Sequence, residues 1–350
     1  EELPSVTVIL TVCDEAARIE TRIHNILACN YPANRIQILV ASDGSVDCTE
    51  EIVSTMAASH PVELVRTGVR AGKTATQNRA LAHARGEIIV FTDAGCAFAP
   101  TFLHRIVAPF ANSNVGGASG RLELMRRGGS LSQSHDYYWR YELALRRLES
   151  ALGILAVSSG ACLAVRSSLV RPMKSHVGED CMVPLDVVEQ GYLFVHCDDA
   201  VIFDAFEQWA HREFGSRVRM TLRNWQGTWL RPALLNPLRH PGYAFALWSH
   251  KLLRWLSPLF LITVSVLPFA MMRESVYAMA GIMVGFFYAA AVVGWLGDRA
   301  GRRVPIAVTV FSFMVANAAF LAGLCYAVTG KKITVYQAGS LGNLEPLDVK

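Results

Sequence analysis

Acidic side chains follow several expected strands in the N-terminal part of the chain, at the point where each strand ends. The acids and the segments before them are Asp14 and Glu15 after residues 6–12, Asp43 after 36–41, and Asp93 after 87–91. Each acid alone also fits a helix N-cap, a turn or a solvated loop. Gathered at one edge, carboxylates would repel a bare phosphate, but they suit a divalent cation or the hydroxyl donors of a nucleotide.

Strand-like and helix-like segments alternate through this part of the chain, and the strands read as nearly continuous apolar runs. The expected strands are 6–12, 36–41, 62–65 and 87–91, and the expected helices are 15–29, 47–58 and 73–84. This order predicts an α/β fold, with a mostly parallel sheet flanked by helices. Ligands bind such sheets beyond the carboxyl ends of the strands. No G-x-G-x-x-G motif opens the first helix, which counts against a dinucleotide oxidoreductase.

The composition narrows the class of protein. Of the 350 residues, 52% are hydrophobic and only 18% are charged, against about 25% charged in ordinary soluble proteins. A disordered chain is excluded, and a net charge of +4 is too mild to indicate nucleic acid. The eight cysteines form no C-x-x-C pair and no zinc-ligand spacing. They read as small buried hydrophobes in a reducing compartment.

The excess of hydrophobic residues lies in three uncharged segments near the C-terminus, of 18, 23 and 27 residues. Because a helix needs about 20 residues to cross the hydrocarbon, we expect a membrane region over 251–330. Its helices should span about 252–272, 275–297 and 304–330. The first run is marginal in length and contains Pro258 and Pro268. The remaining residues, 331–350, would form a C-terminal tail.

Basic residues in the connectors predict the orientation of these helices, since Lys and Arg favour the cytoplasmic side. Two groups should be cytoplasmic: Lys251 with Arg254, and Arg299 with Arg302 and Arg303. Arg273 and Glu274 should face outward. Three spans then put Lys331 and Lys332 outside, against the rule, so either this end is an exception or one span does not cross. The chain opens Glu-Glu-Leu-Pro, and we expect an upstream segment.

A different helix is predicted over about 208–230, within a region 206–250 that joins the two parts. Its apolar stripe follows spacings of four, four, three and four: Phe214, Val218, Leu222, Trp225 and Trp229. Arginines lie off that stripe. This is typical of an amphipathic helix that lies in the lipid headgroup region. A surface helix packed on its own domain fits the periodicity equally well.

Residues 4–205 resemble the catalytic domain of inverting family 2 glycosyltransferases, the group that includes cellulose, chitin and hyaluronan synthases. The resemblance is carried by the order and spacing of residues 8–15, 40–49, 73–78, 91–94 and 177–180. Residues 250–256 also resemble membrane-bound members. The resemblance implies a GT-A-like catalytic domain over 1–205, followed by an amphipathic interfacial helix and about three transmembrane helices.

The resemblance also implies site roles. Donor binding would fall to Asp14, Glu15, Asp43, Lys73, Asp93, Arg217 and Arg219, with Asp93 also holding Mg²⁺ or Mn²⁺. The catalytic residues would be Asp180 and Glu179, with Asp180 as the base that takes the proton of the acceptor hydroxyl. A metal-bound diphosphate leaving group needs charge stabilisation rather than a proton. Lys73 also fits a solvated helix lysine.

Two departures from the family pattern bear on these roles. The second acid of the D-x-D element is Gly95, which leaves the cation fewer protein ligands. The Q-x-x-R-W element of processive members appears as residues 216–220, where Arg219 survives but the Gln and Trp do not. Trp225 with Gln226, or Trp229, would then contact the acceptor. Processive polymerisation stays open.

The leading hypothesis is a metal-dependent glycosyltransferase of the inner cell membrane with a cytoplasmic catalytic domain. It would move a sugar from a nucleoside-diphosphate sugar to a hydroxyl of a lipid-linked or growing polysaccharide, in exopolysaccharide or cell-envelope synthesis. The lipid bilayer is an expected partner, and a second copy or an additional membrane subunit stays open. The alternative is a catalytically silent nucleotide- or glycan-binding sensor, motivated by Gly95. The retained Asp180 counts against it.

Overall fold

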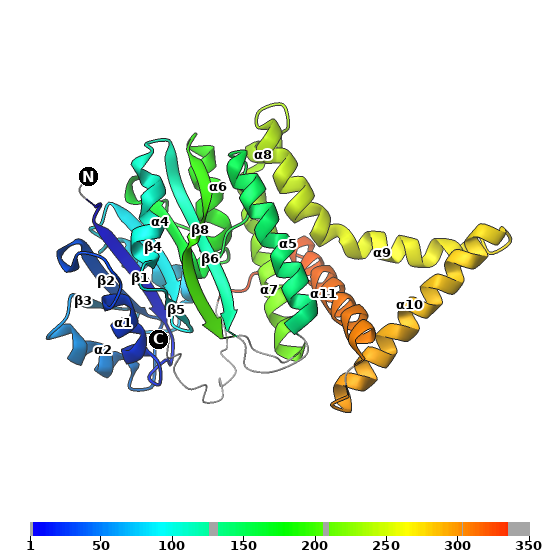
Figure 1. Ribbon diagram of the computed structural model, residues 1–350, viewed down its shortest axis with the longest axis horizontal. Coiled ribbons are helices and arrows are strands. Elements are labelled where there is room, and N and C mark those ends of the chain that lie inside the picture. Colours follow the sequence, from blue (N-terminus) through cyan, green and yellow to red (C-terminus); the bar gives the residue numbers. More distant parts are fainter. Residues whose placement is uncertain (1–2, 126–131, 206–209, 303, 335–350) are drawn as a thin grey trace.

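The computed structural model describes residues 3–125, 132–205, 210–302 and 304–334. An α/β domain occupies the left of Figure 1, and long helices extend from it to the right. The domain begins with alternating elements: β1 (Val6–Val12), α1 (Ile19–Leu27), β2 (Ile36–Ser42), α2 (Thr49–Ala57), β3 (Val62–Arg66), α3 (Lys73–Leu81) and β4 (Ile88–Asp93). These match the strands and helices predicted from hydrophobic patterning.

The second half of the domain has antiparallel pairings that the sequence did not indicate. It contains β5 (Cys96–Phe98), α4 (Phe102–Val107), β6 (Val115–Met125), α5 (Ser132–Ala151), β7 (Leu163–Arg166), α6 (Glu179–Glu189) and β8 (Leu193–Ala205). Within the described residues the strands form one sheet in the order β3-β2-β1-β4-β7-β6-β8-β5. The pairs β4–β7, β6–β7 and β5–β8 are antiparallel, and the other pairs are parallel. The sheet is therefore mixed.

Helices cover both faces of the sheet because side chains alternate along each buried strand. Val8 and Leu10 of β1 point into a core shared with α1, α2 and α4. Ile9, between them, points into the opposite core, which α3 and α6 close. The parallel register puts the ends of β1, β2 and β4 level, with Thr11 paired to Asp93 and Val12 to Ser42. The acids that follow these strands thus share one edge.

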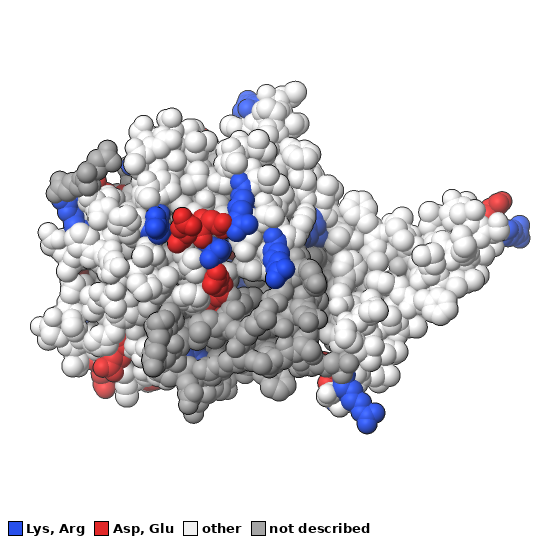
Figure 2. Space-filling view, in the orientation of Figure 1, with Lys and Arg blue, Asp and Glu red and all other residues white. Residues whose placement is uncertain are grey.

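The C-terminal part contains α7 (Ala210–Trp229), α8 (Pro241–Ala246), a π-helix at Leu247–Leu252, α9 (Leu253–Ala270), α10 (Ser275–Arg299) and α11 (Pro305–Val328). Helices α9, α10 and α11 are strongly apolar, whereas α7 is amphipathic. Among the residues that the structure describes, three helical segments are long and apolar enough to cross a membrane: Pro241–Ala270, Ser275–Arg299 and Pro305–Val328. The first extends further toward the N-terminus than predicted. On the face seen in Figure 2, the charged side chains of the apolar helices at the right lie near the helix ends.

The predicted amphipathic helix is present as α7, and the middle of its apolar stripe contacts protein. Val218 and Leu222 are buried, and a Cβ on Gly323 of α11 would lie 2.8 Å from the Thr221 side chain. On another side, a Cβ on Gly227 would lie 2.8 Å from Sγ of Cys181 in α6. Phe214 and Trp229, at the ends of the stripe, are exposed. Helix α7 therefore links α6 to α11.

Candidate active site

Lys73 connects the strand edge to the N-terminus of α6. Its Nζ lies 2.6 Å from Oδ1 of Asp93 and 2.6 Å from Oε1 of Glu179. Asp93 ends β4, Lys73 begins α3, and Glu179 begins α6. Residues separated by more than a hundred positions thus meet at one point. The side chain of Asp93 is 40% exposed, whereas that of Glu179 is buried, so the cluster opens to solvent on the Asp93 side.

The contact between Lys73 and Glu179 keeps both of these side chains ionised. Burial works to lower the pKa of Lys73, but the carboxylates of Asp93 and Glu179 outweigh it and raise this pKa well above the ordinary lysine value. For Glu179, burial works to raise the pKa, but the ammonium of Lys73 holds it below the ordinary value. Gly160 leaves room for this carboxylate, because a Cβ there would lie 2.6 Å from Oε1 of Glu179.

Asp180 lies in the first turn of α6, where the helix dipole favours a negative charge. Its backbone oxygen accepts a hydrogen bond of 2.5 Å from the hydroxyl of Ser158. Its Oδ2 accepts a long one of 3.4 Å from Nδ2 of Asn224 in α7. Gly178 makes space for the other oxygen, since a Cβ there would overlap Oδ1 of Asp180. The carboxylate is held next to Glu179 and is half-exposed.

Arg223 of α7 joins this cluster, and the sequence analysis missed it. Its Nη2 donates to the Thr74 hydroxyl at 2.5 Å and to the carbonyl of Val177. The Thr74 hydroxyl in turn donates to the carbonyl of Val177 at 2.6 Å. Arg223 follows Arg219 by four residues, which puts both on one face of the helix. That spacing was the available signal, and it places Arg219 one turn from the site.

Asp43 is buried and bound to the backbone of the loop before α3. Oδ1 accepts hydrogen bonds from the amides of Ala71 and Gly72 at 2.7 and 2.9 Å, and from the Thr76 hydroxyl at 3.0 Å. Oδ2 accepts a further bond from the Gly72 amide at 3.0 Å. Gly72 has a φ of +91°, a conformation that glycine adopts without strain. Asp43 thereby fixes the loop that delivers Lys73.

Asp14 and Glu15 lie at the end of β1 and hold neighbouring loops. Oδ1 of Asp14 accepts a hydrogen bond of 2.8 Å from the backbone amide of Val46, and Oδ2 forms an ion pair with Arg70. Asp14 itself has a φ of +56°. The Glu15 carboxylate lies 3.6 Å from Arg18, and burial raises the pKa of Glu15. The structure thus brings Asp14, Asp43, Lys73 and Asp93 to one rim.

Residues of α1 hold the turn that follows Asp93. Buried Arg22 donates to the carbonyl of Asp93 at 3.2 Å and to the Thr92 hydroxyl at 2.8 Å. Its guanidinium also lies 4.1 Å from the centre of the Phe98 ring. Asn25 exchanges hydrogen bonds with the backbone of Phe98 at 2.7 and 3.0 Å. These contacts fix the position of Asp93 and of the following strand β5.

The other predicted residues of α7 lie further from Asp180. Trp225 packs between Trp229 and Trp255, with ring centres 6.0 Å apart in both pairs. Gln226 donates to the carbonyl of Lys331 at 2.7 Å. Arg217 is half-buried. Packing between helices accounts for Trp225 and Gln226, and their acceptor-binding role stays a prediction.

The described residues contain no group of three or more His, Cys, Asp or Glu side chains arranged to hold a metal ion. Asp93 nevertheless offers a partly exposed carboxylate at the strand edge. Beside it, at Gly95, a Cβ would meet a single atom of the described part of the chain, Oδ1 of Asp204, at 4.0 Å. These residues fit a cation such as Mg²⁺, which binds through one or two carboxylates together with phosphate and water.

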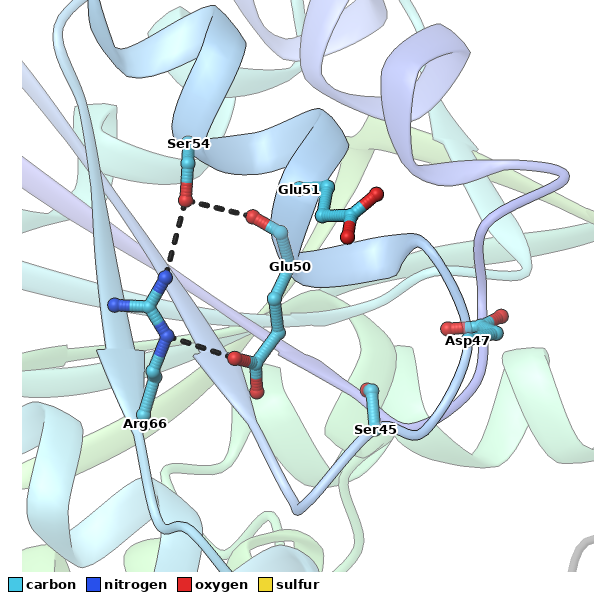
Figure 3. A pocket seen from close by; sticks show the side chains of 6 residues that line it. All are labelled: Ser45, Asp47, Glu50, Glu51, Ser54 and Arg66. Carbon is cyan, nitrogen blue, oxygen red and sulfur yellow. Dashed lines mark hydrogen bonds and ion pairs between the residues drawn. The ribbon is translucent and has the colours of Figure 1, made fainter.

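A separate open hollow of about 480 Å³ lies on the flank formed by α2 and β3. Figure 3 shows its lining, in which Arg66 binds Glu50 and Ser54. Asp47 and Glu51 add further negative charge. With its one cation already paired, this acidic hollow offers nothing to bind an anionic ligand, and it does not contain Lys73 or Asp180.

Comparison with known proteins identifies the family. A model described as glycosyltransferase-like family 2 matches residues 4–227, which is well over half of the chain. The chain belongs to glycosyltransferase family 2. The match covers the α/β domain and most of α7, so the link between α7 and the site lies within the family region. The family membership confirms the resemblance seen in the sequence.

Relatives of this family 2 glycosyltransferase are distant. Glycosyltransferase AglE of Haloferax volcanii is 24% identical over 206 residues, covering 57% of this chain and 66% of that protein. Beta-monoglucosyldiacylglycerol synthase of Synechocystis is 26% identical over 149 residues, covering 40% and 31%. N-acetylglucosaminyltransferase of Mesorhizobium japonicum is 24% identical over 251 residues, covering 67% and 58%. The chain thus spans less than two thirds of the length of each of these relatives.

A solved structure extends the likeness to the fold of nearly the whole chain. It is mannosyltransferase PcManGT from Pyrobaculum calidifontis, in complex with GDP-Man and Mn²⁺. The TM-score is 0.69 and the identity 22%, over 95% of this chain and 89% of that one. The GT-A-like fold class predicted from the sequence is confirmed, including the long apolar C-terminal helices.

Proposed function

We propose that the chain is an inverting sugar transferase that uses a nucleoside-diphosphate sugar. The observation that carries this proposal is the bridge from Asp93 through Lys73 to Glu179, directly beside Asp180. It joins the strand edge, where a nucleotide binds in this type of sheet, to a carboxylate suited to proton removal. The proposal is further supported by the family match over residues 4–227.

In the proposed reaction, Asp180 accepts the proton of an acceptor hydroxyl. The hydroxyl oxygen forms a bond to the anomeric carbon of the sugar, while the bond from that carbon to the diphosphate oxygen breaks. The bonding electrons leave with the nucleoside diphosphate. Inversion follows because the attacking and leaving groups lie on opposite faces of the sugar. Asn224 and Gly178 hold the Asp180 carboxylate in position.

Charge stabilisation of the leaving diphosphate is the second requirement. A Mg²⁺ or Mn²⁺ held by Asp93 would supply part of it. The ammonium of Lys73 supplies more, since its raised pKa keeps it cationic at neutral pH. Arg223 is fixed nearby by Thr74 and Val177. We assign Arg217 and Arg219 to the same diphosphate, and Asp14, Glu15 and Asp43 to the nucleoside side of the donor.

The proposed acceptor is a lipid-linked or membrane-proximal glycan, with the site on the cytoplasmic side of the inner membrane. The apolar helices support this proposal. Lys331 contacts Gln226 of α7, whereas the α9–α10 connection lies at the far end of the molecule in Figure 1. We therefore propose that α9 crosses the membrane, that α10 crosses it back, and that α11 stays on the side of the catalytic domain. Lys331 and Lys332 then obey the positive-inside rule.

The test of function incubates the purified full chain in membrane vesicles with a panel of nucleotide sugars and measures released nucleoside diphosphate. We expect release with one donor, enhanced by acceptor glycolipid and stopped by excess chelator. Donor binding without any release would favour the silent sensor, for which Gly95 is the motivating observation. Sizing the saccharide product then separates single addition from polymerisation.

The test of topology labels single cysteines with a membrane-impermeant thiol reagent in a background without other reactive cysteines. Arg273→Cys should react from the outside of intact cells. Lys332→Cys should react only after the membrane is opened. Labelling of Lys332→Cys in intact cells would contradict the proposed return of the chain.

A further inference from the structure

Strand β8 brings a carboxylate to the place where the D-x-D element lacks one. Asp204 pairs with Cys96 in the antiparallel ladder of β8 and β5, so it lies opposite the residue that follows Gly95. A Cβ on Gly95 would lie 4.0 Å from Oδ1 of Asp204. The Asp204 carboxylate therefore borders the volume that an acidic side chain at position 95 would occupy.

Asp93 and Gly95 also lie close together, because Asp93 ends β4 and Gly95 lies in the turn that follows, directly before β5. Asp93 and Asp204 therefore flank the same turn, one from the end of β4 and the other from the strand that pairs with β5. Arg22 supplies a buried positive charge beneath this turn.

We propose that Asp204 is the second carboxylate ligand of the donor's divalent cation, taking the role that the acid at position 95 would have. Asp93 would supply the first carboxylate ligand, and its side chain also pairs with Lys73. Phosphate oxygens and water complete the coordination, as Mg²⁺ and Mn²⁺ allow. The inference rests on the proposed function, because it concerns the cation of that same site.

The geometry explains how the motif can lose an acid without losing the site. Position 95 lies in the short turn between β4 and β5, and position 204 lies on the strand that pairs with β5. A side chain at position 95 and the carboxylate of Asp204 would border the same space. Because β8 is held by both β6 and β5, Asp204 is on a rigid element, whereas a residue at 95 would be on a turn.

The test measures Mn²⁺ affinity of the full chain in detergent from the loss of the free-ion electron paramagnetic resonance signal, with Mn²⁺ alone and with added GDP. Asp204→Asn should lower the affinity at least about 10-fold, as loss of even outer-shell partners does. The double variant Gly95→Asp with Asp204→Asn should regain most of it. The matched control is Asp199→Asn, an exposed acid on the same strand, which should bind like the unchanged chain.

A third variant keeps the test informative if Asp204→Asn does not fold. Gly95→Asp retains Asp204 and adds a carboxylate to the same space, so Mn²⁺ affinity should rise. Unchanged affinity in this variant, or in a folded Asp204→Asn variant, would overturn the assignment while leaving the transferase proposal intact. Absence of Mn²⁺ binding by the unchanged chain would instead remove the cation from the proposed function, and release of nucleoside diphosphate would still test the transferase.

Discussion

Asp43 and Asp93 follow the two strands that flank β1, but their carboxylates face different surroundings. Asp43 is buried, and both of its oxygens accept hydrogen bonds from the loop before α3. The side chain of Asp93 is 40% exposed and forms an ion pair with Lys73. Two acids that look equivalent in sequence thus differ, because the oxygens of Asp43 are used to fix a loop, whereas the carboxylate of Asp93 stays partly exposed. Burial and the identity of the donors make this distinction.

Asp180→Asn replaces another partly exposed acid of the site and should have the largest effect. Removing the proton acceptor should lower kcat about 10²–10⁴-fold, while the Kd of the donor stays nearly unchanged. The measurement is nucleoside diphosphate release together with equilibrium donor binding. Asp199→Asn, an exposed acid of β8, is the control. A lost donor affinity with normal kcat would assign Asp180 to binding instead.

Gly178→Ala should affect the same carboxylate without changing its chemistry. The added methyl group would displace Oδ1 of Asp180, and misplacement by about 1 Å can cost about 10²-fold in rate. We expect a fall in kcat of this order with an unchanged thermal midpoint. Gly285→Ala, where nothing lies within 4 Å, is the matched control. Normal activity in Gly178→Ala would mean that the Asp180 position is not critical.

Asp43→Asn and Asp93→Asn together test the division directly. An asparagine at position 43 has one oxygen that can accept hydrogen bonds, whereas both oxygens of Asp43 accept them. Each buried donor left unpaired costs about 1–3 kcal/mol. Asp43→Asn should therefore lower the thermal midpoint clearly, and Asp93→Asn should leave it nearly unchanged while reducing turnover. Circular dichroism melts and activity assays measure both. Equal loss of stability in the two variants would remove the distinction.

The pH dependence of stability gives the smallest expected effect. Lys73 holds the pKa of Glu179 below its ordinary value of 4.5 despite burial. The ion pair therefore stabilises the folded chain fully above about pH 4.5, and this contribution is lost as the pH falls through the folded pKa. Glu179→Gln should show a shallower loss of thermal midpoint below pH 4.5. A slope identical to that of the unchanged chain would show that Glu179 does not contribute.

Most of the parallel half of the sheet followed from the sequence because its strands are short apolar runs separated by helical periodicity. The antiparallel half did not, since β6 and β8 carry polar residues and pair across long separations. The strand-end rule brought Asp14, Asp43 and Asp93 to one edge correctly. It could not distinguish Asp43 from Asp93, because hydrogen bonds from loop amides leave no trace in composition.

Contacts between distant segments account for what was missed at the site. Arg223 reaches Thr74 across 149 positions, and Asn224 reaches Asp180 across 44. The apolar stripe of α7 fitted a lipid surface and a protein surface equally well, and tertiary packing buries the middle of this stripe against α11. Pattern alone could not choose between these two partners, because both are apolar.

Gly323 of α11 packs closely against Thr221 of α7, and α11 also packs against α9 and α10, the two helices proposed to cross the membrane. Helices α11 and α7 thereby connect the membrane helices to the carboxylate of Asp180. A change in hydrocarbon thickness alters the tilt of apolar helices, and such a tilt would be passed along α7 to Asn224. The turnover rate should therefore vary with the acyl-chain length of the surrounding lipid, and a bulkier residue at position 323 should blunt that response.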